Sequence, residues 1–238
     1  MAALLIIFAK EPRPGQVKTR LTPPLSPAAA ARLYKNFLAD ILEEMGRLPE
    51  INLALAYTPA GAEDFFRKLA QPSVLLFPQE GADLSERLVR AFDRGFAGGW
   101  ERVLVRNSDS PDLPGDMLLT ANQALESGQT DLVLGPSPDG GYYLVGLNQP
   151  RPQLFQGISW SSPTVLADTL GRARSLSLAV HLLPSWPDID TIDDLRAFAA
   201  QPLLPEGPGR RSYLCARELL TRILNKGTVK KHPAPTSS

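Results

Sequence analysis

The stretch ALLIIFAKEPRPGQVKTR at residues 3–20 joins a continuous apolar run to a basic, proline-rich loop. A short apolar run that ends at a polar loop is typical of a strand that is buried on both faces of a parallel sheet. Ser26 and Pro27 then begin a predicted helix, as an N-cap and a first-turn proline, and apolar residues recur at helical spacing as far as Met45. These segments predict the first strand, loop and helix of an α/β fold.

The same alternation continues along the chain. We predict further strands at 51–57, 73–77, 102–105, 131–135, 142–147 and 178–183, with helices between most of them. Such alternation predicts a mostly parallel, doubly wound sheet with helices on both faces. The two strands within 131–147 follow each other directly and predict one antiparallel element. We expect a single domain over residues 1–201, followed at 202–238 by a linker, a terminal helix (212–225) and a frayed, flexible tail.

The composition excludes several classes of protein. Lys and Arg number 25, as do Asp and Glu, so the formal net charge is zero and we expect no nucleic-acid partner. Cys215 is the only cysteine, which excludes a disulfide framework and fits a reducing compartment. The start lacks the basic region and cleavage site of a signal peptide, and no apolar run reaches the length of about 18 residues that a membrane span needs. We therefore expect a cytoplasmic protein without a membrane partner.

Ligands of open parallel sheets bind beyond the carboxyl ends of the strands, so the loops there are the candidate site. The loop after the first strand carries one acid, Glu11, and four cations, which are Lys10, Arg13, Lys18 and Arg20. Cations together with backbone amides that Gly15 leaves accessible suit a phosphate chain; the alternative is a solvated charged loop. The loop matches neither the Walker pattern nor G-x-G-x-x-G, which argues against a dinucleotide-dependent dehydrogenase.

Two other loops offer carboxylates for a metal ion. Asp109 follows a buried strand, where it could hold Mg²⁺ or Mn²⁺ against a pyrophosphate; the alternative is that the aspartates of this loop only build turns around its prolines. Further along, Thr191 and Asp194 predict a capping box at the start of a helix. Capping leaves Asp188 and Asp190 without a role, and either of them could therefore provide a second metal carboxylate.

The remaining loop, SPDGGYY at residues 137–143, predicts a hairpin turn at Asp139 and Gly140. Gly141 is not needed for a two-residue turn, and it would let the backbone pass close to a substrate. Tyr142 and Tyr143 point to opposite faces of the following strand. We expect one of them in the core and the other in the pocket.

Five segments together resemble a bacterial family with the glycosyltransferase-A, or nucleotide-diphospho-sugar transferase, fold. They are FAKEPRPGQVKTRL (8–21), SDSPDL (108–113), GPSPDGGYYLVGL (135–147), FQGISWSSPTV (155–165) and DIDTIDDL (188–195). Members of this family are labelled glycosyltransferases. The first and last segments are also similar to the guanylyltransferases that make phospholactate guanylate and the molybdenum-cofactor dinucleotide.

The resemblance assigns roles to individual residues. It implies that Lys18 and Arg20 grip the phosphates, and that Asp109 and Asp190 bind the metal ion. The chain departs from the family at Asn107, where a glycine is usual, and Arg106 stands before it. This departure would narrow the pocket or change the nucleotide that fits it.

We therefore expect a transferase that depends on Mg²⁺ or Mn²⁺ and acts on a nucleotide-activated substrate, with a nucleotide sugar as donor and an unidentified small molecule as acceptor. The expected catalytic residues are Lys18, Arg20 and Asp109, the metal ligands are Asp109 and Asp190, and the substrate-binding residues are Lys10, Arg13, Gly15, Asp139, Gly140 and Gly141. Two alternatives are a guanylyl- or cytidylyltransferase that releases pyrophosphate from a nucleoside triphosphate, and a non-catalytic nucleotide sensor. Gln79 and Arg87 could contribute to base recognition, although helix surface and core are the simpler interpretation.

Overall fold

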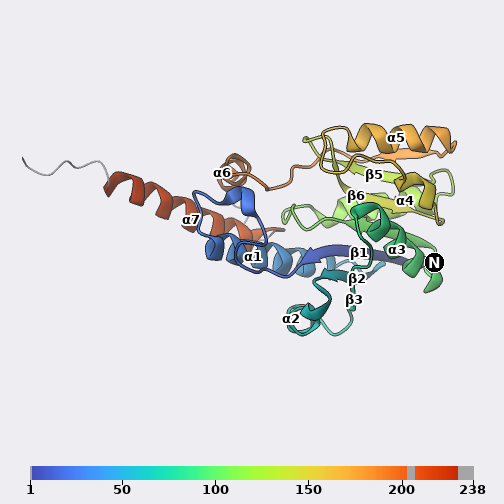
Figure 1. Cartoon of the computed structure of the whole chain (residues 1–238). Helices are drawn as coiled ribbons and strands as arrows, with labels where there is room; N and C mark the ends of the chain where they lie inside the picture. Colours follow the sequence, from blue (N-terminus) through green and yellow to red (C-terminus); the bar gives the residue numbers. More distant parts are fainter. Residues whose placement is uncertain (1, 203–206, 230–238) are drawn as a thin grey trace, which may run out of the picture.

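A computed structural model describes residues 2–202 and 207–229. A seven-stranded sheet runs through its centre in the order β3-β2-β1-β4-β6-β5-β7 (Figure 1). The strands are β1 (Ala3–Lys10), β2 (Ile51–Thr58), β3 (Leu75–Pro78), β4 (Arg102–Arg106), β5 (Leu132–Pro136), β6 (Tyr142–Leu147) and β7 (Val180–Leu182). All neighbours pair in parallel except β6, which is antiparallel to both β4 and β5. The predicted sheet with one antiparallel element is confirmed.

Helices cover both faces of the sheet. The helices are α1 (Pro27–Met45), α2 (Glu63–Leu69), α3 (Leu84–Ala97), α4 (Gly115–Glu126), α5 (Val165–Ser175), α6 (Ile192–Ala200) and α7 (Arg210–Val229), with short 3-10 turns η1 (Thr19–Leu21), η2 (Ala60–Ala62) and η3 (Pro152–Phe155). Along β1, Leu5 and Ile7 belong to a core with α1, α4, α6 and α7, whereas Leu4 and Ile6 belong to a second core with α3 and α5. The doubly wound architecture therefore follows from a strand whose alternate side chains are all apolar.

The first helix begins as the sequence predicts. The side chain of Ser26 accepts a hydrogen bond from the backbone N–H of Ala29, and Pro27 occupies the first turn. Other boundaries differ by a few residues, because local patterns fix the ends of an element less firmly than its centre. For example, β3 begins at Leu75, two residues later than predicted.

The C-terminal helix is longer than predicted and packs on the domain (Figure 1). It begins at Arg210 and continues to Val229, through the first residues of the predicted tail. Its first turn is anchored on α1 by the buried carboxylate of Asp40, which accepts hydrogen bonds from the backbone N–H and the hydroxyl of Ser212. Residues 203–206 of the predicted linker and 230–238 of the predicted tail lie outside the described residues, and the division at residue 201 stays a prediction. None of the described helices combines the length and apolar character that a membrane span needs.

Candidate active site

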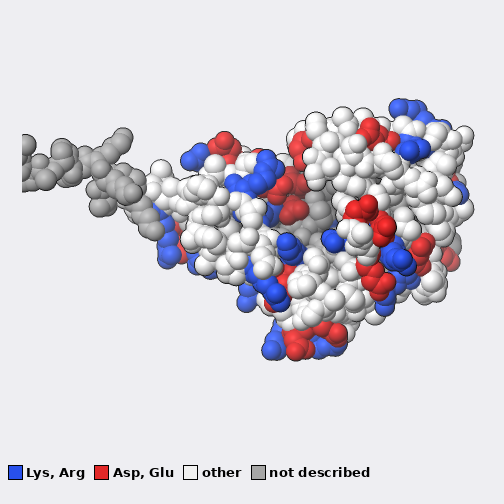
Figure 2. Space-filling view, in the orientation of Figure 1, with Lys and Arg blue, Asp and Glu red and all other residues white. Residues whose placement is uncertain are grey.

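A cavity of about 890 Å³ opens where β1 and β4 end and β6 begins. Residues from all four predicted loops line it. The space-filling view shows this hollow with acidic and basic atoms gathered around it (Figure 2). The four loops therefore meet at one cavity, at the sheet edge where the rule for parallel sheets predicts a ligand site.

Lys18 stands at the centre of the charged end of this cavity. Its backbone adopts a left-handed conformation, with φ of 48°, directly before η1. The ammonium nitrogen lies 2.6 Å from Asp109 Oδ1 and donates hydrogen bonds to Asp190 Oδ1 at 2.8 Å and to the carbonyl oxygen of Ile189 at 2.7 Å. Only 4% of the Lys18 side chain is exposed. Burial lowers the pKa of this amine, but the two carboxylates outweigh burial and raise it above its usual value.

The two predicted metal carboxylates meet at this ammonium. The backbone N–H of Ile189 donates to the carbonyl oxygen of Asp109 at 2.9 Å, which ties the two loops together. Asp190 directly precedes α6, whose predicted capping box between Thr191 and Asp194 is present. About a third of each carboxylate side chain is exposed, 35% for Asp109 and 38% for Asp190. Both carboxylates line the cavity, so one ligand could reach both of them.

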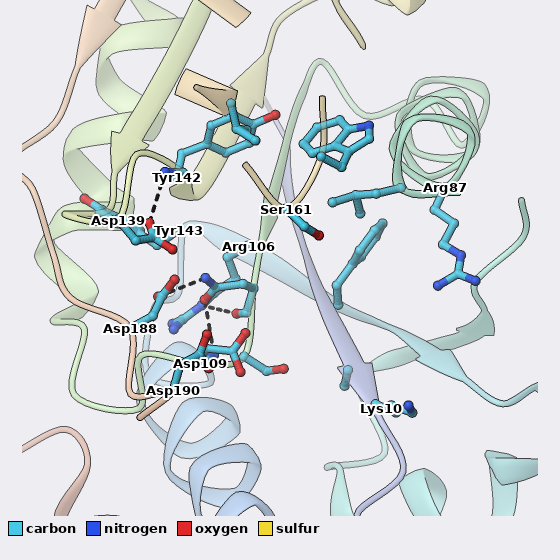
Figure 3. A pocket seen from close by; sticks show the side chains of 18 of the residues that line it. Lys10, Arg87, Arg106, Asp109, Asp139, Tyr142, Tyr143, Ser161, Asp188 and Asp190 are labelled. Carbon is cyan, nitrogen blue, oxygen red and sulfur yellow. Dashed lines mark hydrogen bonds between the residues drawn. The ribbon is translucent and has the colours of Figure 1, made fainter. Parts of the chain in front are cut away.

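A third carboxylate, Asp188, lies beside them (Figure 3). Its Oδ1 atom accepts hydrogen bonds from the side chains of Asn107 at 3.0 Å and Ser110 at 2.6 Å, and its Oδ2 atom accepts one from Ser137 at 3.3 Å. Burial raises the pKa of Asp188 to about 6, and the neighbouring Asp109 carboxylate adds to the effect. From the sequence, Asp188 is one of two possible second metal carboxylates, and the resemblance selects Asp190; the hydrogen bonds of Asp188 to three other side chains are not predicted.

Arg106 and Asn107, where the chain departs from the family, support the loop that carries Asp109, and Asn107 also bonds to Asp188. Arg106 is almost fully buried and donates to the carbonyl oxygens of Asn107 at 3.0 Å and Ser110 at 2.7 Å. Burial lowers the pKa of its guanidinium to about 10, against the opposing effect of nearby aspartates. The Asn107 side chain bonds Asp188 and accepts from the backbone N–H of Asp109 at 3.2 Å. A glycine at position 107 would provide neither bond.

The other predicted residues divide into two groups. Those that line the cavity are Lys10, Arg20, Asp139 and Gly141, whereas Arg13, Gly15 and Gly140 do not line it. Arg20 is 70% exposed and approaches Asp190 only to 3.8 Å, while Arg13 forms an ion pair with Glu11 at 2.6 Å. The geometry therefore gives no support to a substrate contact by Arg13 or Gly15.

Gly140 lies in the predicted hairpin turn and also has a packing role that the sequence does not predict. Its φ is +89°, and a Cβ atom there would collide with the backbone carbonyl of Pro163. The backbone N–H of Leu166 also donates to the Gly140 carbonyl oxygen at 2.8 Å. Gly140 thus lets the hairpin pack against the segment that leads into α5. Asp139 accepts from the backbone N–H of Gly141 at 3.0 Å and presents its carboxylate to the cavity (Figure 3).

The opposite end of the cavity is aromatic, which the sequence predicted only in part. The rings of Tyr142 and Trp160 meet edge to face, with centroids 6.2 Å apart, and the indole N–H of Trp160 donates to the hydroxyl of Ser85 at 2.6 Å. Ser161, with φ of 63°, lies between this end and the carboxylates in Figure 3. Both tyrosines line the cavity, although Tyr143 is buried as a core residue. From the sequence, residues 155–165 are singled out only by their resemblance to the family.

Gln79 and Arg87, for which surface and core was the simpler interpretation, also line the cavity. The side-chain amide of Gln79 donates to the carbonyl oxygens of Ala56 at 2.8 Å and Ala9 at 3.2 Å. The guanidinium of Arg87 donates from Nε to the carbonyl oxygen of Gly81 at 3.1 Å. Both side chains are therefore held in place at the cavity by bonds to backbone carbonyl oxygens.

The residues present fit a divalent ion that binds together with a substrate. Within residues 2–202 and 207–229, no group of three or more His, Cys, Asp or Glu side chains forms a metal site by itself. Mg²⁺, however, is usually bound by one or two carboxylates plus substrate phosphates rather than by a complete protein cage. Asp109 and Asp190 meet that description, since both reach the cavity and both contact the same nitrogen atom.

Comparison with known proteins identifies the family. Residues 41–162, about half of the chain, match the family model described as "Uncharacterized protein conserved in bacteria (DUF2064)". The chain belongs to this family. A crystal structure from Desulfovibrio desulfuricans G20, described as a "putative nucleotide-diphospho-sugar transferase", is 34% identical with a TM-score of 0.86, over 94% of this chain and 98% of that chain. A search of curated proteins finds no match.

More distant structures share the fold. The synthetase of CMP:2-keto-3-deoxy-manno-octonic acid, solved with CTP, is 12% identical with a TM-score of 0.55, over 85% of this chain and 100% of that chain. A cytidylyltransferase from Leptospira borgpetersenii is 13% identical with a TM-score of 0.52, over the full length of both chains. The DUF2064 chain therefore has the nucleotide-diphospho-sugar transferase fold, and both the predicted resemblance and the predicted enzyme class, a transferase, are confirmed.

Proposed function

We propose that the protein transfers a group from a nucleotide sugar to a small-molecule acceptor, in a reaction that needs Mg²⁺ or Mn²⁺. The observation that carries the proposal is one cavity that joins paired carboxylates at one end to an aromatic wall at the other. A nucleotide sugar has the same division, because its diphosphate is charged whereas its rings have apolar faces. The Desulfovibrio relative carries the name of a nucleotide-diphospho-sugar transferase, and the proposal extends that activity to this chain.

The charge of the lining supports a need for a divalent ion. Five basic side chains line the cavity (Lys10, Lys18, Arg20, Arg87 and Arg106), against the four carboxylates of Asp109, Asp139, Asp188 and Asp190. Lys18 is already paired, and Arg106 is buried. The four carboxylates offset most of the charge of the five cations, so the lining alone only partly neutralises a diphosphate. A divalent ion on Asp109 and Asp190 would supply that charge and stabilise the departing nucleoside diphosphate.

The chain's own residues orient the donor. Lys10 and Arg20 are exposed cations at the cavity and can steer phosphate oxygens toward the carboxylate pair. Asp188, fixed by three hydrogen bonds, holds the loops that carry Asp109 and Asp190 in register. The acceptor and donor sugar lie, in this proposal, between Asp139 and the aromatic end.

The aromatic end favours a donor that carries a ring. The flat faces of Trp160 and Tyr142 suit the apolar face of a sugar, while the hydroxyls of Ser161 and Ser162 and the Asp139 carboxylate can bond its hydroxyls. A nucleoside triphosphate carries a base and a ribose, but unlike a nucleotide sugar it has no second sugar beyond its last phosphate that could occupy this end. These features support glycosyl transfer over the other candidates.

Nucleotidyl transfer is the second candidate, favoured by three cations that line the cavity, Lys10, Arg20 and Arg87, of which Arg20 lies 3.8 Å from Asp190. Release of pyrophosphate from GTP or CTP would distinguish it, since glycosyl transfer releases a nucleoside diphosphate.

We place the reaction in the cytoplasm, where nucleotide sugars are abundant and where a lone buried cysteine, Cys215, stays reduced.

Calorimetric titration with UDP, GDP, CDP, ADP and their glucose or mannose conjugates, with and without Mn²⁺, tests the proposal. We expect one nucleotide family to bind only with Mn²⁺, and Asp109→Asn to weaken that binding at least about tenfold. The matched control is Asp116→Asn, which removes an exposed carboxylate of α4 that does not line the cavity. If no nucleotide binds under any condition, or if Asp109→Asn binds like the wild type, the proposal is wrong.

A further inference from the structure

All three N–H donors of the Lys18 ammonium are occupied by protein oxygens. The three acceptors are Asp109 Oδ1, Asp190 Oδ1 and the Ile189 carbonyl oxygen, at 2.6, 2.8 and 2.7 Å. A lysine ammonium has three donors and no more. In the metal-free protein, Lys18 therefore has no hydrogen bond left to offer a phosphate, although it lines the cavity.

The ammonium also occupies the position that a shared metal ion needs. Both carboxylate oxygens lie within hydrogen-bond distance of one nitrogen atom, so an ion that bridged them would take the place of that nitrogen. Mg²⁺–oxygen distances of about 2.0 to 2.1 Å require each carboxylate to close in by only a fraction of an ångström. A divalent ion and an ammonium cannot share this space, since like charges so close repel strongly.

We propose that Lys18 is an internal counter-ion that the divalent ion displaces. In the metal-free protein it holds Asp109 and Asp190 together as a positioning residue. With a divalent ion and a nucleotide present, Asp109 and Asp190 would hold the ion, and the freed ammonium of Lys18 would bond a phosphate oxygen. This inference rests on the proposed function, and it explains how one lysine can serve both the acids and the substrate.

The surroundings of Lys18 suit such an exchange. Val17 and Leu21 are buried on either side of it in the sequence and anchor the loop, whereas Gln16, Thr19 and Arg20 are exposed and line the cavity. The side chain can therefore move toward the cavity without unfolding its loop. The exchange also balances charge: the metal ion neutralises both carboxylates, and the lysine meets a negative phosphate instead.

Electron paramagnetic resonance titration of Mn²⁺ tests the exchange. We expect Lys18→Met to bind Mn²⁺ about tenfold more tightly than the wild type, because the competing cation is gone, and to bind the nucleoside diphosphate less tightly in the presence of Mn²⁺. Its melting temperature without metal should fall, and Mn²⁺ should restore it. The matched control is Lys35→Met, an exposed lysine of α1, which should behave like the wild type.

The outcomes separate this inference from the proposed function. If Mn²⁺ binds through Asp109 but Lys18→Met binds it equally or less tightly, the exchange is wrong and the metal site stands. If Mn²⁺ does not bind, or if Asp109→Asn does not affect it, both fail. Should Lys18→Met not fold, crystals of the wild type with Mn²⁺ and UDP, GDP or CDP decide the question. The exchange requires Mn²⁺ between the two carboxylates and Lys18 on a phosphate, and it is overturned if Lys18 still bonds both carboxylates.

Discussion

At one end of the cavity, Lys18 is bonded to Asp109, Asp190 and a backbone carbonyl. At the other end, Trp160 and Tyr142 form a wall with hydroxyl groups beside it. The loops of the charged end are fixed by bonds between distant parts of the chain, so their backbones have few ways to adapt. The aromatic end relies on ring packing, which accepts related shapes. We therefore infer that the charged end determines whether the reaction occurs and the aromatic end determines which ring is bound.

The largest expected effect is at the charged end. Asp190→Asn removes one of the two proposed metal carboxylates and should lower the turnover rate by about 10²-fold or more. The measurement is steady-state nucleoside diphosphate release with Mn²⁺. Asp193→Asn is a close control, since that side chain is 84% exposed on α6 and should leave the rate unchanged. Equal rates for the two variants would contradict the assigned role.

A second prediction concerns the anchor of the hairpin beside the aromatic end. Gly140→Ala places a methyl group against the Pro163 carbonyl at a positive φ, and should destabilise the fold by about 3 kcal/mol. Gly15→Ala is the matched comparison, because Gly15 also has a positive φ but open space around it; its cost should be about 1 kcal/mol. Urea unfolding measures both, and equal losses would show that contact with Pro163 does not matter.

The third prediction concerns pH. Because the pKa of Asp188 is raised to about 6, between about pH 4 and 6 the folded chain holds a proton that the unfolded chain has released. The contribution of Asp188 to stability is therefore present below this range and is lost as the pH rises through it. Asp188→Asn, which keeps an acceptor oxygen, should stabilise the metal-free protein by about 2 kcal/mol at pH 7.5 and not at pH 4. Urea unfolding across this range checks it, and a pH-independent difference would refute it.

The smallest effect is expected at the aromatic wall. Trp160→Ala should weaken binding of the nucleotide sugar about tenfold relative to the matching nucleoside diphosphate, and Trp160→Phe should weaken it less, because a ring remains. Calorimetry with both ligands provides the comparison. If both ligands lose affinity equally, the wall contributes stability rather than recognition of the ring.

Most of the fold could be predicted from the sequence. The run ending at Ala9 is short and apolar at every position, as expected of a strand that is buried on both faces of the sheet. Ser26 and Pro27 fix the start of α1 by local chemistry. The last residue of α7 could not be predicted, because apolar residues do not recur at helical spacing between Lys226 and Val229.

The site could be located but not assembled from the sequence. Four loops were predicted at one edge because strand direction determines where loops emerge. The sequence predicts that Lys18, Asp109 and Asp190 come together, but not that the ammonium bonds both acids directly, because those contacts depend on the exact placement of loops more than 80 residues apart in the chain. Arg106 is a buried charged residue at the end of β4, and its bonds to two carbonyl oxygens of the next loop and its nearby aspartates, which only the folded structure brings together, explain why it is there.

The central claim is that Asp109 and Asp190 share one divalent ion with the phosphates of a nucleotide. Pulsed electron paramagnetic resonance of Mn²⁺ bound to the protein with a nucleoside diphosphate measures this directly, because phosphorus nuclei in the first coordination shell couple to the ion. We predict one Mn²⁺ per chain with strong phosphorus coupling, and loss of the protein-bound signal in Asp109→Asn and Asp190→Asn. A bound ion without phosphorus coupling, or one that persists unchanged in both variants, would contradict the account.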